Sequence, residues 1–78
     1  MATMLKYKDI EGDSGIAAYE IGPRSIKVKF SRDGTYLYDD SVPGTQHVIE
    51  MQRRARMGKG LNTYINRYVR GNYREKLS

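Results

Sequence analysis

The stretch Ser25-Ile-Lys-Val-Lys-Phe30 places apolar side chains at every second position and lysines between them. Residues two apart on a strand share a face, so this alternation predicts a β-strand with one buried face. A second strand is expected upstream at residues 16–21, before the turn residues Gly22-Pro-Arg-Ser25. A third is expected at residues 35–38, after the turn Ser31-Arg-Asp-Gly34. Together they predict a three-stranded antiparallel meander.

The segment before this meander has two possible structures. Residues 1–13 either add an edge strand at residues 5–7 or form an N-terminal tail, and Gly12-Asp-Ser-Gly15 contains turn residues typical of a break. We assign residues 14–78 to a single domain, because a chain of 78 residues can build only one modest core.

In the second half, the spacing of apolar residues changes to that of a helix. Val48, Met51 and Ala55 fall on one side of a helix, and Gly58-Lys-Gly60 ends it. A second helix follows the i, i+3, i+4, i+7, i+8 pattern, with Leu61, Tyr64, Ile65, Tyr68 and Val69 on one face. Gly71 lies where a C-cap glycine is expected. The predicted fold is therefore α+β, a three-stranded antiparallel β-meander packed by two C-terminal helices.

The composition argues against several classes of function. The chain has no cysteine and one histidine, His47, so disulfide frameworks, Cys-ligated zinc sites and recognisable nucleophile–base motifs are excluded. The mean hydropathy is -0.73, and no apolar run approaches the ~20 residues of a membrane span. We expect a cytoplasmic protein that is not an enzyme, with no cofactor, no metal, no small-molecule substrate and no concave pocket.

Positive charge is concentrated in the second half of the chain. Residues 1–40 carry six basic and seven acidic side chains, whereas residues 41–78 carry eight basic and two acidic ones. Six of these eight cations are arginines, whose planar guanidinium suits bidentate contact with phosphate. The same residues could instead solvate the outer faces of helices. We favour binding of a polyanion because the charge is concentrated in one half.

Tyr36 and Tyr38 share one face of their strand, but the sequence leaves open which one. A two-residue turn at Asp33-Gly34 would place them beside lysines on the open face, as a platform for stacking bases. A three-residue loop would pair Phe30 with Tyr36 and turn both tyrosines into the core. We favour the core, because so small a domain needs its aromatic residues for burial.

The order of several motifs is similar to a known family. These are Ile16…Tyr19, the strand ending at Phe30, Gly34, Tyr36-Leu-Tyr38, Val42-Pro43 and Gly58-Lys-Gly-Leu-Asn62…Ile65. Over residues 14–73 the chain resembles the KTSC domain, which occurs at the C-terminus of some lysyl-tRNA synthetases and as a small bacterial protein. Gly60 replaces an aromatic residue common in that family, and Leu37 replaces a polar one.

The resemblance implies RNA binding, which the synthetase context suggests for the family. It implies packing roles for Tyr36, Tyr38 and Ile65, and contact roles for Lys59 and Asn62. We therefore predict a small non-enzymatic module that binds nucleic acid, with RNA favoured, through an arginine-rich helical face. The expected contacts are Arg53, Arg54, Arg56, Lys59, Asn62, Arg67, Arg70 and Arg74. The alternative is a protein-interaction module that docks to an acidic partner or a larger enzyme.

Overall fold

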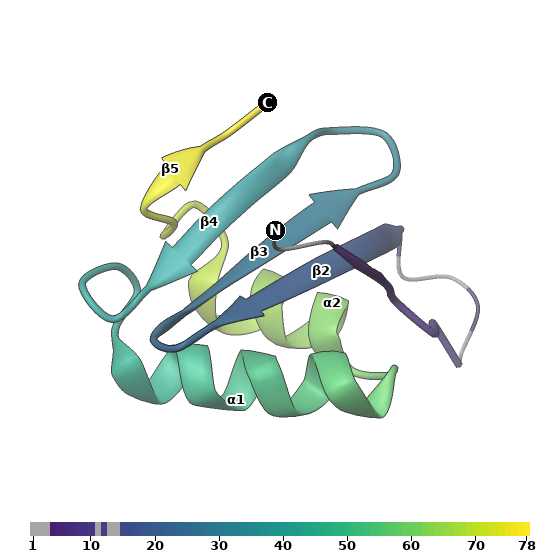
Figure 1. Cartoon of the computed structure of the whole chain (residues 1–78), viewed down its shortest axis with the longest axis horizontal. Coiled ribbons are helices and arrows are strands. Elements are labelled where there is room, and N and C mark those ends of the chain that lie inside the picture. The colour runs from purple at the N-terminus through teal and green to yellow at the C-terminus, as the bar shows by residue number, and fades with distance from the viewer. Residues whose placement is uncertain (1–3, 11, 13–14) are drawn as a thin grey trace.

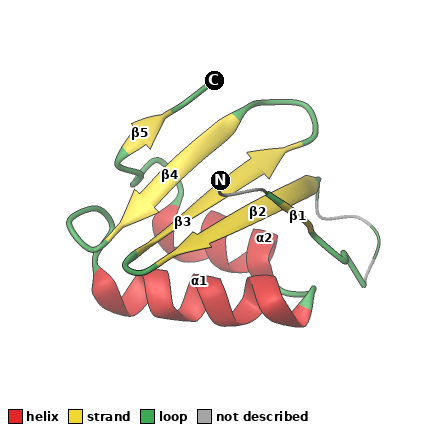
Figure 2. Cartoon of the chain, in the orientation of Figure 1, coloured by secondary structure: helices red, strands yellow, loops and turns green. Residues whose placement is uncertain are grey.

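The computed structural model describes residues 4–10, 12 and 15–78. An antiparallel sheet is covered on one face by two helical segments (Figures 1 and 2). The elements are β1 (Leu5–Lys6), β2 (Ile16–Gly22), β3 (Ser25–Phe30), β4 (Thr35–Asp39), α1 (Thr45–Met57), α2 (Leu61–Tyr64), its π-helical continuation η1 (Ile65–Val69), and β5 (Glu75–Lys76). The α+β class is confirmed, and all the strands except β5 come before the helices. The prediction of three strands is wrong, because the sheet has five in the order β1-β2-β3-β4-β5.

The two additional strands lie at the edges of the sheet and have two residues each. In β1, Leu5 lies opposite Tyr19 of β2, so this segment forms the edge strand rather than a separate tail. In β5, Lys76 lies opposite Tyr36 of β4. Two residues are too short to show a period, which is why β5 was not predicted. The break expected at Gly12–Gly15 includes residues 13 and 14, which lie outside the described residues.

The register of the β3–β4 hairpin differs from both registers considered above. Val28 lies opposite Tyr36 and Ile26 opposite Tyr38, and the hairpin closes where the Phe30 N–H donates to the Gly34 carbonyl at 2.9 Å. This register places both tyrosines on the face of Ile26 and Val28, which the helices cover. The expected core orientation is therefore right, although the pairing behind it is shifted by two residues.

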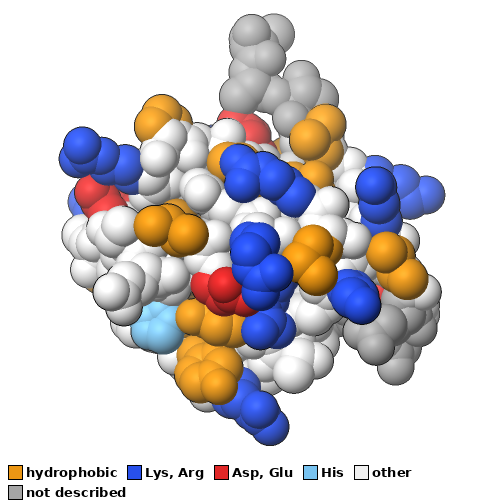
Figure 3. Space-filling model, turned by 90° about the horizontal axis from the view of Figure 1, so that it is seen from below, with side chains coloured by type: hydrophobic (Ala, Val, Ile, Leu, Met, Phe, Trp, Pro, Cys, Tyr) orange, Lys and Arg blue, Asp and Glu red, His pale blue; other side chains and the backbone are white. Residues whose placement is uncertain are grey.

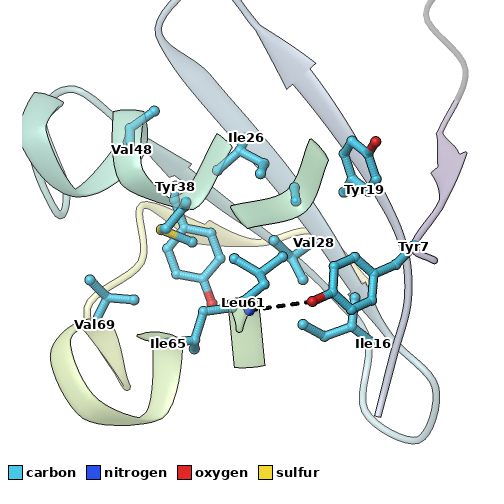
Figure 4. Close-up of a cluster of buried hydrophobic side chains, with 12 residues drawn as sticks. Tyr7, Ile16, Tyr19, Ile26, Val28, Tyr38, Val48, Leu61, Ile65 and Val69 are labelled. Atoms are coloured by element: carbon cyan, nitrogen blue, oxygen red, sulfur yellow. Dashed lines mark hydrogen bonds between the residues drawn. The ribbon is translucent and has the colours of Figure 1, made fainter. Parts of the chain in front are cut away.

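The core lies between the sheet and the helices (Figure 4). Ile26 and Val28 of β3, Met51 of α1 and Leu61 of α2 are all fully buried in this one cluster. The other buried side chains are Tyr7, Ile16, Tyr19, Tyr38, Val48, Ala55, Ile65 and Val69. The alternate residues of β3, Lys27 and Lys29, lie on the uncovered face of the sheet.

The second helix departs from the predicted pattern at one position. Leu61, Ile65 and Val69 are buried, but Tyr68 is 54% exposed. From Ile65 the helix has the wider π turn. Ile65 and Val69, four residues apart, therefore both face the core, whereas Tyr68, three residues after Ile65, points away from it. In the described part of the chain, no helix is long and apolar enough to cross a membrane.

Candidate nucleic-acid interface

The C-terminal half of α1 carries three of the six arginines of the predicted interface, and Glu50 pairs with two of them. Arg53 makes a bidentate pair with Glu50, with Nε to Oε1 at 3.0 Å and Nη2 to Oε2 at 2.6 Å. Arg54 Nε donates to the same Oε2 at 2.6 Å. Hydrogen bonds from Arg53 and Arg54 lower the pKa of Glu50 to about 2. Half of the positive charge on this arginine pair is thus neutralised within the helix.

Arg54 also stabilises the turn between the helices. Its Nη1 donates to the Gly60 carbonyl at 3.1 Å, and its guanidinium carbon lies 4.9 Å from the ring centroid of Tyr64. The side chain therefore joins α1, the turn and α2 through a hydrogen bond and a cation–π contact. The structure gives Arg54 a bracing role that its charge alone did not indicate.

Arg74 lies apart from the helical arginines. The helix ends before Arg70, whose backbone is extended, and the chain then turns to join the sheet edge. Arg74 Nη1 lies 3.4 Å from Asp39 Oδ2 and donates to Ser41 Oγ at 2.8 Å. The expected row of Arg67, Arg70 and Arg74 is therefore broken at its last member, which braces the loop between β4 and α1.

Four of the predicted contacts keep an uncompensated charge. Arg56, Lys59, Arg67 and Arg70 are exposed, and none forms an ion pair within the described part of the chain. Figure 3 shows the face that bears α1, where Lys and Arg side chains gather with acidic and hydrophobic side chains between them. The face is basic but interrupted, not a continuous ribbon of cations.

A cluster of aromatic side chains lies across the seam between the helices. Tyr64 and Tyr68 have ring centroids 4.8 Å apart. His47, in the first turns of α1, lies with Nδ1 2.7 Å from the Tyr64 hydroxyl and with its ring 6.5 Å from that of Tyr68. The helical spacing predicts both tyrosines on the buried face, whereas Tyr68 is exposed and Tyr64 only partly buried. The sequence does contain a signal for this cluster, because tyrosines four residues apart on a helix are neighbours and their hydroxyls favour the solvent-exposed edge of a core.

A second feature is a groove between β4 and the second helix. Asn62 and Arg70, both predicted contacts, line it together with Tyr36, Tyr38 and Tyr73. A concave surface lined by polar groups was not expected in so short a chain. Nothing in the sequence pattern locates it, because Tyr73 lies beyond the last helix and is brought in by the turn to β5.

The tyrosines of the groove differ in their surroundings. Tyr38 is buried, and its burial together with the nearby Tyr36 and Tyr73 phenols raises its pKa well above the ordinary value. Tyr36 is half-buried and donates to Asp33 Oδ2 at 2.6 Å, which raises the pKa of Tyr36 and lowers that of Asp33. Asp33 also lies 3.3 Å from Lys76 Nζ, so its charge is locally compensated.

The described residues contain no group of three or more His, Cys, Asp or Glu side chains placed to hold a metal ion. Comparison of the chain with protein-family models, with curated proteins and with solved structures finds no match. The KTSC resemblance therefore stays a prediction from the sequence motifs.

Proposed function

We propose that this protein is a small non-enzymatic module that binds single-stranded nucleic acid across its helical face. The observation that carries the proposal is the exposed Tyr68, whose ring lies tilted against that of Tyr64 and which follows the uncompensated Arg67 in the chain. Single-strand binders combine a basic track for the backbone with aromatic rings for the bases, and each stacked base contributes ~1–3 kcal/mol. RNA is the favoured form on the KTSC resemblance.

The cations lie at both ends of the helix pair. Arg56 and Lys59 are near the end of α1, whereas Arg67 belongs to η1, which returns to the start of α1 where Tyr68 meets His47. Arg56 lies nine positions after His47, about 14 Å along the helix at 1.5 Å per residue. Tyr68 lies beside His47 at one end and Tyr64 beside Arg54 toward the other, so a strand that contacts both ends can reach both rings.

The test is fluorescence anisotropy with labelled RNA and DNA oligonucleotides of one sequence, at several salt concentrations. We expect binding at low salt whose log–log slope is about −0.7 per contacted phosphate. The double variant Arg56→Gln/Lys59→Gln should weaken binding to all sequences alike and reduce the slope by about 1.4.

A matched control is the double variant Lys27→Gln/Lys29→Gln, which removes the same charge from the uncovered face of the sheet. It should leave the slope nearly unchanged. Equal effects of the two double variants would show that only net charge matters and would contradict the proposed face. No binding at low salt would refute the function, and co-purification of one stoichiometric, nuclease-insensitive protein would then favour the acidic-partner alternative.

A further inference from the structure

The groove beside β4 has the size and lining of a ligand site. Its volume is about 700 Å³, and it is open to solvent on one side. Pockets for small ligands span roughly 300–1,000 Å³, with mainly apolar walls and a few convergent polar groups. Here the walls come from elements far apart in the sequence, namely β3, β4, the second helix and the segment before β5.

Aromatic rings form one side of the groove. Tyr36 and Tyr73 have centroids 4.6 Å apart at an interplanar angle of 71°, and Phe30 lies 5.7 Å from Tyr36 at 80°. Neighbouring rings stand nearly perpendicular, the edge-to-face arrangement that aromatic pairs prefer, and Lys76 Nζ lies 5.6 Å from the centroid of Tyr36. A flat heterocycle can stack on a face while its rim meets the edge of the next ring.

Several polar groups of the groove have no hydrogen-bond partner among the described residues. Tyr38 is 2% exposed, yet its hydroxyl makes no hydrogen bond within the described part of the chain. Since no fully buried side-chain oxygen or nitrogen of the described residues lacks a partner, this hydroxyl reaches the groove surface. Figure 4 shows it directed toward Ile65, which lines the same groove.

Two side-chain amides and one cation complete the lining. Asn62 and Asn66 lie four residues apart on the second helix, and their amides form no hydrogen bond with another described residue. Each amide offers a donor and an acceptor, the complement of a base edge. Arg70 is exposed, unpaired among the described residues, and lies where the helix ends. The carboxylate that lines the groove, Asp33, is compensated by Lys76.

We propose that this groove binds one nucleotide, with its base against Tyr36 and Tyr73, its base edge on Asn62, Asn66 and the Tyr38 hydroxyl, and its phosphate on Arg70. The inference rests on the proposed nucleic-acid function and adds a site for one base away from the tyrosine pair of the helical seam. The nucleotide comes either from the bound strand or from the free mononucleotide pool.

The experiment has two arms that separate these sources. In the first, ¹H–¹⁵N spectra are recorded while each ribonucleoside monophosphate, or inorganic phosphate as control, is added to the full chain. In the second, the labelled oligonucleotide is added. Occupation of the groove should shift the side-chain amide signals of Asn62 and Asn66 and the backbone signal of Tyr73, whereas phosphate alone should shift only signals near Arg70.

The sharpest variant is Tyr38→Phe, which keeps the buried ring and removes only the hydroxyl. Loss of one hydrogen bond should weaken oligonucleotide binding about three- to tenfold while the salt slope stays unchanged, because no phosphate contact is lost. Asn62→Ala should have a similar effect. Tyr19→Phe is the matched control, since Tyr19 is also buried with a hydroxyl unpaired among the described residues but does not line the groove.

The outcomes separate this site from the helical face. If only the oligonucleotide shifts the NMR signals of the groove residues, the site is supported and is assigned to the bound strand. If mononucleotides also shift these signals, the site also binds free nucleotides. The oligonucleotide could instead bind in a salt-dependent way without shifting the NMR signals of the groove, and Tyr38→Phe could bind it with wild-type affinity. These results would overturn the nucleotide site and leave the proposed function standing. Groove shifts with mononucleotides but no oligonucleotide binding would support the site and refute the proposed function.

Discussion

The N-terminal segment is held to the second helix by Tyr7, and this contact gives a sharp test of the fold. The Tyr7 ring is 2% exposed and packs edge-to-face on Tyr19 at a centroid distance of 6.5 Å. Its hydroxyl accepts a hydrogen bond at 3.3 Å from the N–H of Leu61, the first residue of α2 (Figure 4). The first N–H groups of a helix have no partner within the helix, so this hydroxyl supplies one.

The variant Tyr7→Phe leaves the buried Leu61 N–H without that acceptor. An unsatisfied buried donor costs about 1–3 kcal/mol, and the long 3.3 Å bond places the expected loss near 1 kcal/mol. Domains of this size have unfolding free energies of about 4–12 kcal/mol, at roughly 0.05–0.15 kcal/mol per residue. The melting temperature should therefore fall by about 4–8 °C. Tyr7→Ala also removes the ring and should cost about 3–5 kcal/mol.

Urea unfolding followed by circular dichroism measures these differences, since a change in midpoint at constant m-value reports stability directly. Tyr19→Phe is the control, because it removes a hydroxyl that has no hydrogen-bond partner among the described residues from the adjoining ring. The reasoning is refuted if Tyr7→Phe unfolds at the same urea concentration as Tyr19→Phe and Tyr7→Ala loses less than about 1 kcal/mol. The N-terminal segment would then contribute little to the core.

Three further predictions test the helix cap, the arginine pair and the buried phenol. Gly58 has φ +79°, and a Cβ there would lie 2.6 Å from Lys8 Cβ, whereas Gly71 has φ +76° in open space. Gly71→Ala should therefore lose ~1–2 kcal/mol of stability to backbone strain, and Gly58→Ala should lose more because it also meets Lys8. Thermal melting measures both losses, and equal losses would contradict the close contact. The pKa of Glu50 is lowered from 4.5 to about 2, so the stability that its ionised form contributes is complete above about pH 4.5 and is lost as the pH falls toward 2. The melting temperature of Glu50→Gln should lie below that of the wild type at pH 7 and converge with it near pH 2. The difference should be modest, because the Glu50 side chain is 27% exposed and solvent screens its ion pairs. Burial raises the pKa of Tyr38, so in a spectrophotometric titration Tyr38→Phe should retain the full absorbance change near pH 10, and a loss of one tyrosine's share there would show that the phenol is solvated.

Part of the interface could be predicted from local spacing alone. The arginines of α1 follow directly from the sequence. Their pairing with Glu50 also has a sequence signal, since Glu50 lies three and four residues before Arg53 and Arg54, the spacing at which charges meet on a helix. The groove could not be predicted in this way. Asn62 and Arg70 become its lining only because Tyr73 is carried back against Tyr36 by the turn that leads to β5.

The sequence by itself determined the strand Ser25–Phe30, the helix Thr45–Met57 and the α+β class, because hydrophobic period and glycine breaks act between residues a few positions apart. Only the tertiary structure decided the two edge strands, the hairpin register and which cations remain unpaired. Each of these depends on contacts between distant segments, such as Tyr7 with Leu61 and Asp39 with Arg74. Such contacts leave no periodic mark in the chain, since their free energy comes from burial and pairing that exist only after the segments have met.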